Sequence, residues 1–267
     1  MKRSVFGMVS SYQGLTQSDW LWKQTPDAFG AWKRIQMLAQ CPNPDFLLLY
    51  QYNFQAPKPP TQKRIWPFQS KMKPQVDAAA HVQASLRGVA KEQLVCLMRE
   101  PPLEELVARH QKKYQQAQKY CAYVSGPEEF APIPDYMPAI WYVNVPFQSL
   151  DNMHPPEKVR ACSWITSGVN RTENHRKRLD FLRLLKDADM SEIDVYGRDL
   201  PEWSGAKGSV NNKWYVMAPY RYNLAIENYA DNQWYVSEKL WDALLAWCLP
   251  IYYGGVAADQ LLPKGSF

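Results

Sequence analysis

Charged and hydroxyl side chains gather around the start of one expected helix near the end of the chain. Glu227 and Asn228 directly follow an apolar run, and Ser237, Glu238 and Lys239 open the helical pattern that comes next. Ser is a strong helix N-cap, and the free N–H groups and dipole of a helix N-terminus attract anions. Lys239 would add a full positive charge there. These residue types indicate a phosphate site, although a lysine that simply points to solvent would produce the same pattern.

A second expected helix, residues 172–188, also begins with basic residues. Those at or near its start are Arg171, Arg176, Lys177 and Arg178. Arg can bind phosphate oxygens with its planar guanidinium group. Two basic helix starts at one sheet edge suggest a diphosphate ligand, and a solvated basic helix face is the alternative.

Glu100 is a candidate of a different kind, because it directly follows the apolar run 93–99. Pro101 and Pro102 separate it from the helical pattern 103–120. A carboxylate held at the carboxyl end of a strand could act as a general base. Capping of the following helix is the alternative role for this carboxylate.

Short apolar runs alternate with helical patterns along the chain, which predicts an α/β fold with parallel sheets and helices on both faces. In such folds, ligands lie beyond the carboxyl ends of the strands, where the candidate residues fall. The expected strands are 45–53, 93–99, 159–166, 193–197, 220–226 and 249–254, and the expected helices are 103–120, 172–188 and 238–248.

A polar segment, residues 148–160, contains two adjacent prolines and separates two strand–helix series. It predicts two doubly wound domains that face each other across a cleft, with residues 1–155 in the first and 156–267 in the second. The Pro-rich, basic segment 56–74 is expected to be an exposed loop of the first domain.

Bulk composition sets further limits. The net charge of +5 over 267 residues fits an anionic ligand, but it also fits no special partner. The five cysteines and four histidines are dispersed, which is typical of a reduced cytosolic protein and suggests no zinc site. The sequence shows no signal peptide and no apolar stretch of about 20 residues, so we expect no integral membrane segment.

Three segments resemble a known enzyme family. YRYNLAIEN…YVSEKLWDALLAWCLPIYYGG…LLPKGSF, residues 220–267, resembles the donor-binding motif of the α1,3/α1,4-fucosyltransferases, glycosyltransferase family 10. CSWITSGVNRTENHRKRLDFLRLL…IDVYGR resembles the segment that leads into their donor domain, and VCLMREPP resembles the acceptor-domain strand that ends in the catalytic Glu. The resemblance implies a GT-B fold, with an acceptor-binding first domain and a second domain that binds GDP-fucose.

The resemblance also implies roles for the candidate residues. Glu100 matches the general base of an inverting transfer from GDP-fucose to a glycan hydroxyl. Arg176 and Lys239 match the cations that neutralise the diphosphate, and Glu238 matches the carboxylate that binds the ribose hydroxyls. The other expected donor contacts are Asn228 and Tyr235, together with Glu227 from its place at the strand end. The family uses no bound metal, so we expect no metal and no cofactor besides the donor substrate.

The resulting prediction is an α1,3-fucosyltransferase that acts on N-acetylglucosamine or glucose. We expect a cytoplasmic enzyme, as the bacterial members of the family are, either free or peripheral at the inner membrane face. The alternatives are a GT-B transferase for another nucleotide sugar and a non-catalytic glycan- or nucleotide-binding protein. Nucleic-acid binding around Lys63, Arg64, Trp66 and Lys71 is disfavoured, because no recognition motif is present.

Family members continue beyond the position of Phe267 with another strand and helices. We therefore expect a second domain that is short at its C-terminus, with apolar surface uncovered near Ile251 and Tyr253. Exposed apolar surface favours association, so the expected consequence is lower stability than that of a longer relative, or a homodimer.

Overall fold

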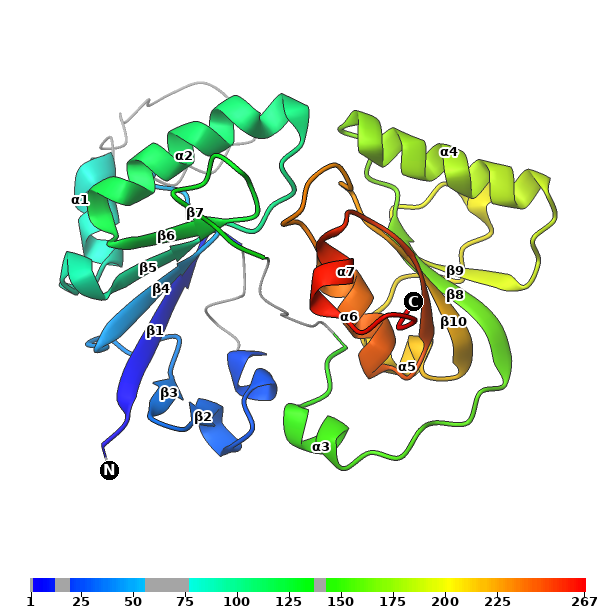
Figure 1. Cartoon of the computed structure of the whole chain (residues 1–267), viewed down its shortest axis with the longest axis horizontal. Helices are drawn as coiled ribbons and strands as arrows, with labels where there is room; N and C mark the ends of the chain where they lie inside the picture. The colour runs from blue at the N-terminus through cyan, green and yellow to red at the C-terminus, as the bar shows by residue number, and fades with distance from the viewer. Residues whose placement is uncertain (1, 13–19, 56–76, 137–142) are drawn as a thin grey trace, which may run out of the picture.

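The computed structural model describes residues 2–12, 20–55, 77–136 and 143–267. Two β-sheets with packed helices lie side by side, one from each half of the chain (Figure 1). The first has the strand order β2-β3-β1-β4-β5-β6-β7, and the second has the order β11-β10-β8-β9. All pairings are parallel except that of β2 with β3. The α/β class and the parallel sheets predicted from the sequence are therefore confirmed.

The elements of the first half are as follows. The strands are β1 (Ser4–Ser10), β2 (Ala31–Trp32), β3 (Ile35–Met37), β4 (Phe46–Tyr50), β5 (Leu94–Leu97), β6 (Tyr123–Gly126) and β7 (Ile133–Pro134). The helices are α1 (Ala78–Ser85), α2 (Val107–Tyr120) and α3 (Phe147–Asp151), with short 3-10 helices at Trp20–Gln24, Ala28–Gly30, Lys91–Gln93 and Glu104–Leu106. The predicted loop 56–74 and its basic residues lie outside the described residues.

The second half begins after the predicted boundary segment. The strands are β8 (Arg160–Ser167), β9 (Ile193–Arg198), β10 (Tyr220–Ile226) and β11 (Leu249–Tyr253). The helices are α4 (Glu173–Asp187), α5 (Lys213–Met217), α6 (Glu238–Leu245) and α7 (Ala257–Leu261), with a 3-10 helix at Glu202–Ser204. The expected strands and helices of this half agree with these bounds to within a few residues.

Side-chain alternation explains how helices cover both faces of the second sheet. Trp164 of β8 and Val195 of β9 form a core with Leu182 of α4 on one face. Tyr220 of β10 and Ala243 of α6 belong to a separate core on the other face. Successive residues of a strand point to opposite faces, and β8 and β9 each contribute to both cores. This half is doubly wound, as predicted.

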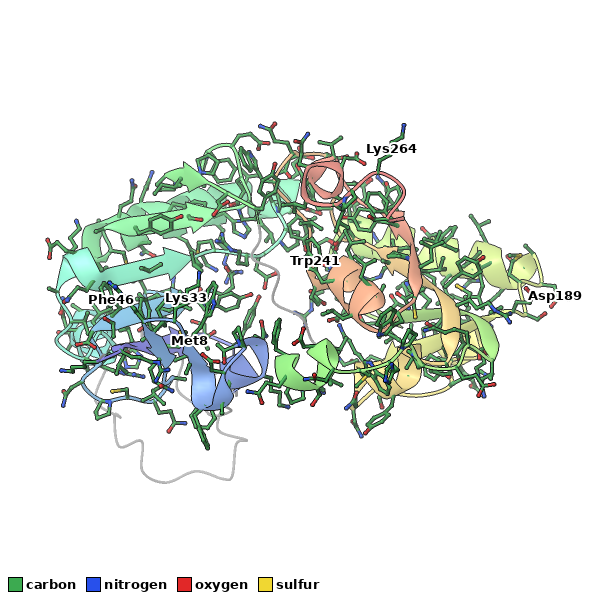
Figure 2. All side chains as sticks on the ribbon, turned by 60° about the horizontal axis from the view of Figure 1, so that its bottom comes forward. Met8, Lys33, Phe46, Asp189, Trp241 and Lys264 are labelled. Carbon is green, nitrogen blue, oxygen red and sulfur yellow. The ribbon has the colours of Figure 1, made fainter. Side chains whose placement is uncertain are left out.

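In the first half, α1 and α2 pack against the same core, which includes Leu47 and Leu49 of β4. The opposite face of β4 packs through Tyr50 against Met8 and Ala39. Figure 2 shows side chains filling the space around both sheets, with Met8 in the first half and Trp241 in the second. Within the described residues, no helix is long and apolar enough to span a membrane.

Sequence patterns did not predict β1, although this strand lies between β3 and β4 inside the first sheet. Gly7 interrupts its apolar run, and a Cβ at that position would lie 2.9 Å from Nη1 of Arg87. That guanidinium donates hydrogen bonds to the carbonyls of Ala39, Cys41 and Met8 at 2.7–3.2 Å. A glycine therefore occupies the strand because the partly buried side chain of Arg87 needs the space.

Candidate active site

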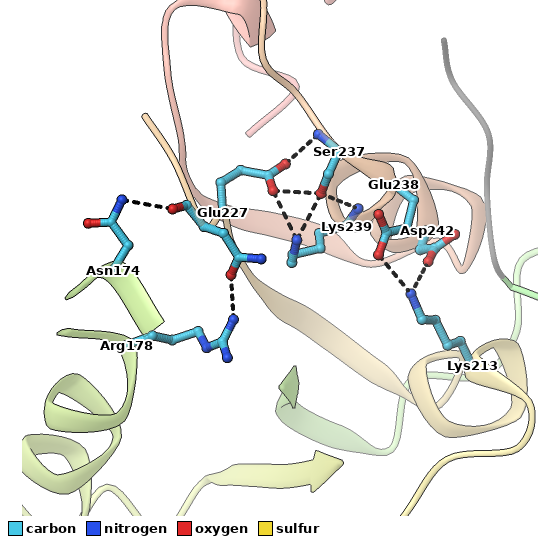
Figure 3. A network of polar contacts seen from close by, with 9 residues as sticks. Asn174, Arg178, Lys213, Glu227, Ser237, Glu238, Lys239 and Asp242 are labelled. Carbon is cyan, nitrogen blue, oxygen red and sulfur yellow. Dashed lines mark hydrogen bonds and ion pairs between the residues drawn. The ribbon is translucent and has the colours of Figure 1, made fainter. Parts of the chain in front are cut away.

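Glu227 lies where β10 ends, and its carboxylate fixes the start of α6. It accepts hydrogen bonds from Ser237 N at 2.7 Å and Ser237 Oγ at 2.5 Å, and it pairs with Lys239 Nζ at 3.0 Å (Figure 3). The Glu227 side chain is fully buried. Its carboxylate therefore positions Ser237 and Lys239, and the direct donor contact expected from the sequence stays a prediction.

Ser237 is the N-cap of α6, as predicted. Its Oγ accepts a hydrogen bond from Lys239 N at 3.3 Å, and Lys239 Nζ lies 2.9 Å from the same oxygen. The Lys239 side chain is 21% exposed, so its ammonium group still reaches solvent. A helix N-terminus, a hydroxyl group and a partly exposed ammonium group thus meet at one point, which suits an anionic ligand.

Glu238, the next residue, belongs to a second ion-pair network. Lys213 Nζ of α5 lies 3.5 Å from Glu238 Oε1 and 2.6 Å from Asp242 Oδ2 (Figure 3). Burial alone would raise the pKa of Glu238, but the charges of Lys239 and Lys213 lower it to about 2. Burial also opposes the charge on Lys213, whereas Asp242 and Glu238 raise its pKa. Glu238 is therefore ionised and available to accept hydrogen bonds from hydroxyl groups.

Sequence reasoning missed Lys213 and Asp242. Asp242 follows Glu238 by four residues on α6, a spacing that places the two carboxylates on one helix face and that could have been noticed. Nothing in the sequence indicates that Lys213 would reach this face, because it comes from a separate short helix. The side chain of Asp242 is 1% exposed and that of Lys213 is 23% exposed, so the carboxylate is buried and the ammonium group is partly buried.

The start of α4 contributes Arg178, which the sequence did not single out from its basic neighbours. Arg178 is 7% exposed and donates hydrogen bonds to Asn228 Oδ1, Ser167 O and Ser167 Oγ. Burial lowers the pKa of its guanidinium group. Arg178 therefore joins the end of β8 to the segment that follows β10.

Arg176, the residue expected at the diphosphate, is not brought to this cluster. It is exposed, its Nη1 lies 3.4 Å from Asn170 O, and it lines a separate hollow with Trp203. Two residues along an α-helix correspond to a rotation of about 200°, so Arg176 and Arg178 point to opposite sides. The structure therefore places Arg178 in the polar cluster, and the diphosphate role expected of Arg176 stays a prediction.

The other two expected donor contacts have different environments. Asn228 accepts from Arg178 through Oδ1, and its backbone oxygen accepts from Asn174 Nδ2 at 2.9 Å. Tyr235 is 3% exposed, and burial raises the pKa of its phenol. Asn228 thus lies in the polar cluster, whereas Tyr235 is part of the interior beneath it.

A cavity of about 450 Å³ opens beside this cluster. Phe181, Leu224 and Ile251 give it an apolar wall, whereas Arg178, Asn228 and Asp231 are polar. An apolar pocket with a few convergent polar groups is typical of small-molecule sites. The cavity therefore extends the polar cluster into a space that could hold part of a nucleotide or sugar.

Glu100 follows β5 in the first half and is partly buried. Burial raises the pKa of its carboxyl, with smaller opposing effects from Lys113, His110 and Lys239, and Glu238 adds to the increase. The charges of Glu238 and Lys239 act on Glu100 although they belong to the other half of the chain. The structure thus brings the predicted base into electrostatic contact with the start of α6.

Behind Glu100 lies a buried polar cluster that the sequence did not reveal. Glu128 is 1% exposed, pairs with His110 Nδ1 at 2.7 Å and accepts a hydrogen bond from the Tyr114 hydroxyl. His110 and Tyr114 are four residues apart on α2, so they share one helix face. This cluster fixes α2 against the segment after β6, and α2 in turn presents Lys113 and His110 to Glu100.

Comparison with known proteins finds similarity to one enzyme family over part of the chain. Residues 155–267 match the model described as glycosyltransferase family 10 (fucosyltransferase), C-terminal part. A 3-galactosyl-N-acetylglucosaminide 4-alpha-L-fucosyltransferase of Bos taurus is 31% identical over 139 residues, which cover 49% of this chain and 34% of that protein. A GDP-fucose protein O-fucosyltransferase 3 of Gallus gallus is 34% identical over 80 residues, which cover 27% of this chain and 17% of the relative.

Solved structures of an alpha1,3-fucosyltransferase also align with the chain. The form with GDP-fucose has a TM-score of 0.37 at 15% identity, over 97% of this chain and 70% of that one. A further structure of an alpha1,3-fucosyltransferase has a TM-score of 0.39 at 14% identity over the same shares. The chain spans less than two thirds of the length of the curated relatives that it matches. Over residues 155–267, the chain is similar to the C-terminal part of glycosyltransferase family 10, the fucosyltransferases.

Proposed function

We propose that the protein transfers fucose from GDP-fucose to a hydroxyl group of a glycan, with inversion at the anomeric carbon and without a metal ion. The observation that carries this proposal is the electrostatic interaction between a candidate base in the first half and a charged helix start in the second half. A carboxyl with a raised pKa, Glu100, acts electrostatically on a helix start that holds Lys239 and ionised Glu238. The similarity of residues 155–267 to the fucosyltransferase family model supports fucose as the transferred sugar.

The second half would bind the donor. Lys239 and the α6 N-terminus would contact the diphosphate, and Arg178 would provide a second cation beside Asn228. Cationic groups that are already in position stabilise the negative charge that develops on the departing diphosphate. Glu238 would accept hydrogen bonds from the ribose hydroxyls, which its depressed pKa allows at any physiological pH.

The first half would activate the acceptor. As the acceptor oxygen forms its bond to the anomeric carbon, the bond from that carbon to the diphosphate breaks, and GDP leaves with the electron pair. Glu100 takes the proton of the acceptor hydroxyl. A raised pKa makes a carboxylate a better base near neutral pH, and general-base help is typically worth about 10²–10⁴ in rate. From the family resemblance, we assign the reacting hydroxyl to position 3 of N-acetylglucosamine or glucose.

We place this enzyme in the cytoplasm. The five cysteines are all free, and four of them are buried. Unpaired, dispersed thiols of this kind are typical of a reducing compartment. Fractionation of cells that produce the tagged chain would test the location, and recovery in a secreted fraction would contradict it.

Thermal unfolding and turnover together test the proposal. GDP should raise the melting temperature in the presence of EDTA, with a dependence on concentration that follows mass action. Glu100→Gln should keep this stabilisation and lose most transfer from GDP-fucose. Stabilisation by UDP in preference to GDP would indicate another nucleotide sugar, and GDP binding without any turnover would indicate a binding protein. A requirement for Mg²⁺ or Mn²⁺ would overturn the metal-independent mechanism.

A further inference from the structure

The segment between β10 and α6, residues 229–236, reaches from the second half to the first (Figure 1). We call it the bridging loop. Its central residue is Asn232, which is 8% exposed. Asn232 Nδ2 donates a hydrogen bond to Pro127 O of the first half at 2.7 Å, a separation of 105 positions in sequence. Its Oδ1 accepts hydrogen bonds from Trp234 N at 3.1 Å and Tyr235 N at 2.9 Å. One side chain thus shapes the loop and joins the halves.

Aromatic packing supports the same contact. The rings of Trp234 in the bridging loop and Tyr136 in the first half lie 5.1 Å apart between centroids. Tyr136 also packs against the apolar cluster of Val236 and Leu240. On the other side of the loop, Gly255 allows a close approach, because a Cβ there would lie 2.6 Å from Asn232 O. The loop is therefore packed against the second half on one side and against the first half on the other.

Both partners of the Asn232–Pro127 hydrogen bond lie in segments that adjoin the candidate catalytic groups. Pro127 follows β6, and β6 pairs with β5, the strand that precedes Glu100. The bridging loop itself begins after Asn228 and ends before Ser237 and Lys239. Neighbouring parallel strands end at the same edge of their sheet. This hydrogen bond therefore joins the sheet edge near Glu100 to the sheet edge near Lys239, from which the glycan acceptor and the sugar donor would approach each other.

We infer that Asn232 is a positioning residue that sets the spacing between Glu100 and the donor site. This inference rests on the proposed function. The reason lies in the amide group, which supplies a donor and an acceptor at the same time. The acceptor keeps the loop in shape, and the donor fixes the loop to Pro127. Misplacement of reacting groups by about 1 Å can cost about 100-fold in rate, so this bond would affect turnover more than donor affinity.

The Asn232→Asp variant separates the two roles of this side chain, which are to keep the loop in shape and to bond to Pro127. The aspartate keeps an acceptor oxygen for Trp234 N and Tyr235 N, but it replaces the N–H donor with a carboxylate oxygen that faces the Pro127 carbonyl. Asn152→Asp is the matched control, because Asn152 Nδ2 also donates to a backbone carbonyl, Gln148 O at 2.8 Å, but within one local segment of the first half. The carboxamide is changed in the same way in both variants, and of these two residues only Asn232 bonds across the halves.

Hydrogen exchange, small-angle scattering and kinetics provide the readouts. Asn232→Asp should keep the amides of Trp234 and Tyr235 protected, increase exchange in residues 127–136 and increase the radius of gyration. Its kcat for transfer should fall by about 10- to 100-fold with GDP affinity little changed. Asn152→Asp should behave like the wild type in every assay.

Wild-type exchange and scattering in Asn232→Asp would overturn the inference, whatever the activity. Altered exchange and scattering with a normal kcat would also overturn it, because the link would then exist without positioning the reaction. If the wild-type protein does not use GDP-fucose, the proposed function fails. The inference fails with it as a statement about catalysis, and the exchange and scattering data then report only the structural link.

Discussion

Lys213 provides the most direct test of the electrostatics of the site, because one ammonium group serves two carboxylates. It lies 2.6 Å from Asp242 Oδ2 and 3.5 Å from Glu238 Oε1. Lys213→Met removes this charge while it keeps most of the side-chain volume. Asp242, which is 1% exposed, then remains as a buried carboxylate that has lost its nearest cation.

The expected magnitudes follow from this geometry. Loss of one partner of a buried ion pair typically costs about 3–5 kcal/mol, and we expect Lys213→Met to lower the free energy of unfolding by that amount. Asp242→Asn should cost about 1–3 kcal/mol, because Lys213 still has Glu238 and the amide can accept a hydrogen bond. The double variant should cost less than the sum by about 1–3 kcal/mol, since Asp242 then carries no charge that could be left unpaired.

Urea unfolding followed by tryptophan fluorescence measures these free energies, provided that the slope with urea stays constant. Lys177→Met is the control, because Lys177 pairs with Glu173 at 2.8 Å while both side chains are more than 60% exposed. Exposed pairs of this kind contribute less than about 1 kcal/mol. Additive effects of the two network substitutions, or an equal loss from Lys177→Met, would refute the claim that the buried network stabilises this part of the molecule.

The pH dependence adds a second readout. The folded pKa of Glu238 is about 2, below its ordinary value of 4.5, so its contribution to stability is fully present above pH 4.5 and is lost as the pH falls towards 2. Lys213→Met removes one of the charges that depress this pKa. The acid-induced loss of stability should therefore begin at higher pH in the variant. An unchanged pH dependence of the free energy of unfolding below pH 4.5 would contradict the role of Lys213 in lowering the pKa of Glu238.

Three further outcomes are expected. Arg178→Ala should weaken GDP binding, measured by calorimetry, by about tenfold or more, whereas Arg176→Ala should leave it nearly unchanged; the reverse order would restore the sequence-based choice. The transfer rate should rise with pH along a limb set by the raised pKa of Glu100, and the limb should vanish in Glu100→Gln; a limb that persists would assign it to another group. Ile251 and Tyr253 are 51% and 64% exposed, so Ile251→Lys should abolish concentration-dependent light scattering, and a wild-type chain that is monomeric at all concentrations would exclude the homodimer.

Local sequence signals determined most of the second half. Apolar runs identified β8, β10 and β11, and Ser237 marked the start of α6, because a capping side chain bonds to backbone groups two residues away. The general position of the candidate site followed from one rule, that ligands lie beyond the carboxyl ends of parallel strands. The basic start of α4 and the carboxylate after β5 were found in the same way. These features depend on neighbours in sequence, so the sequence contains them.

The tertiary structure decided which side chains meet. Arg176 and Arg178 are only two residues apart on α4, but Arg176 is exposed and Arg178 is buried. Their basic character alone does not distinguish them. Lys213 reaches Glu238 from another helix, and Asn232 meets Pro127 from the other half of the chain. Such contacts depend on how whole elements pack, and hydrophobic periodicity specifies a buried face without specifying its partner. The sequence thus determined most elements of the second half and the edge at which the site lies, and the packing of the elements selected the residues that meet there.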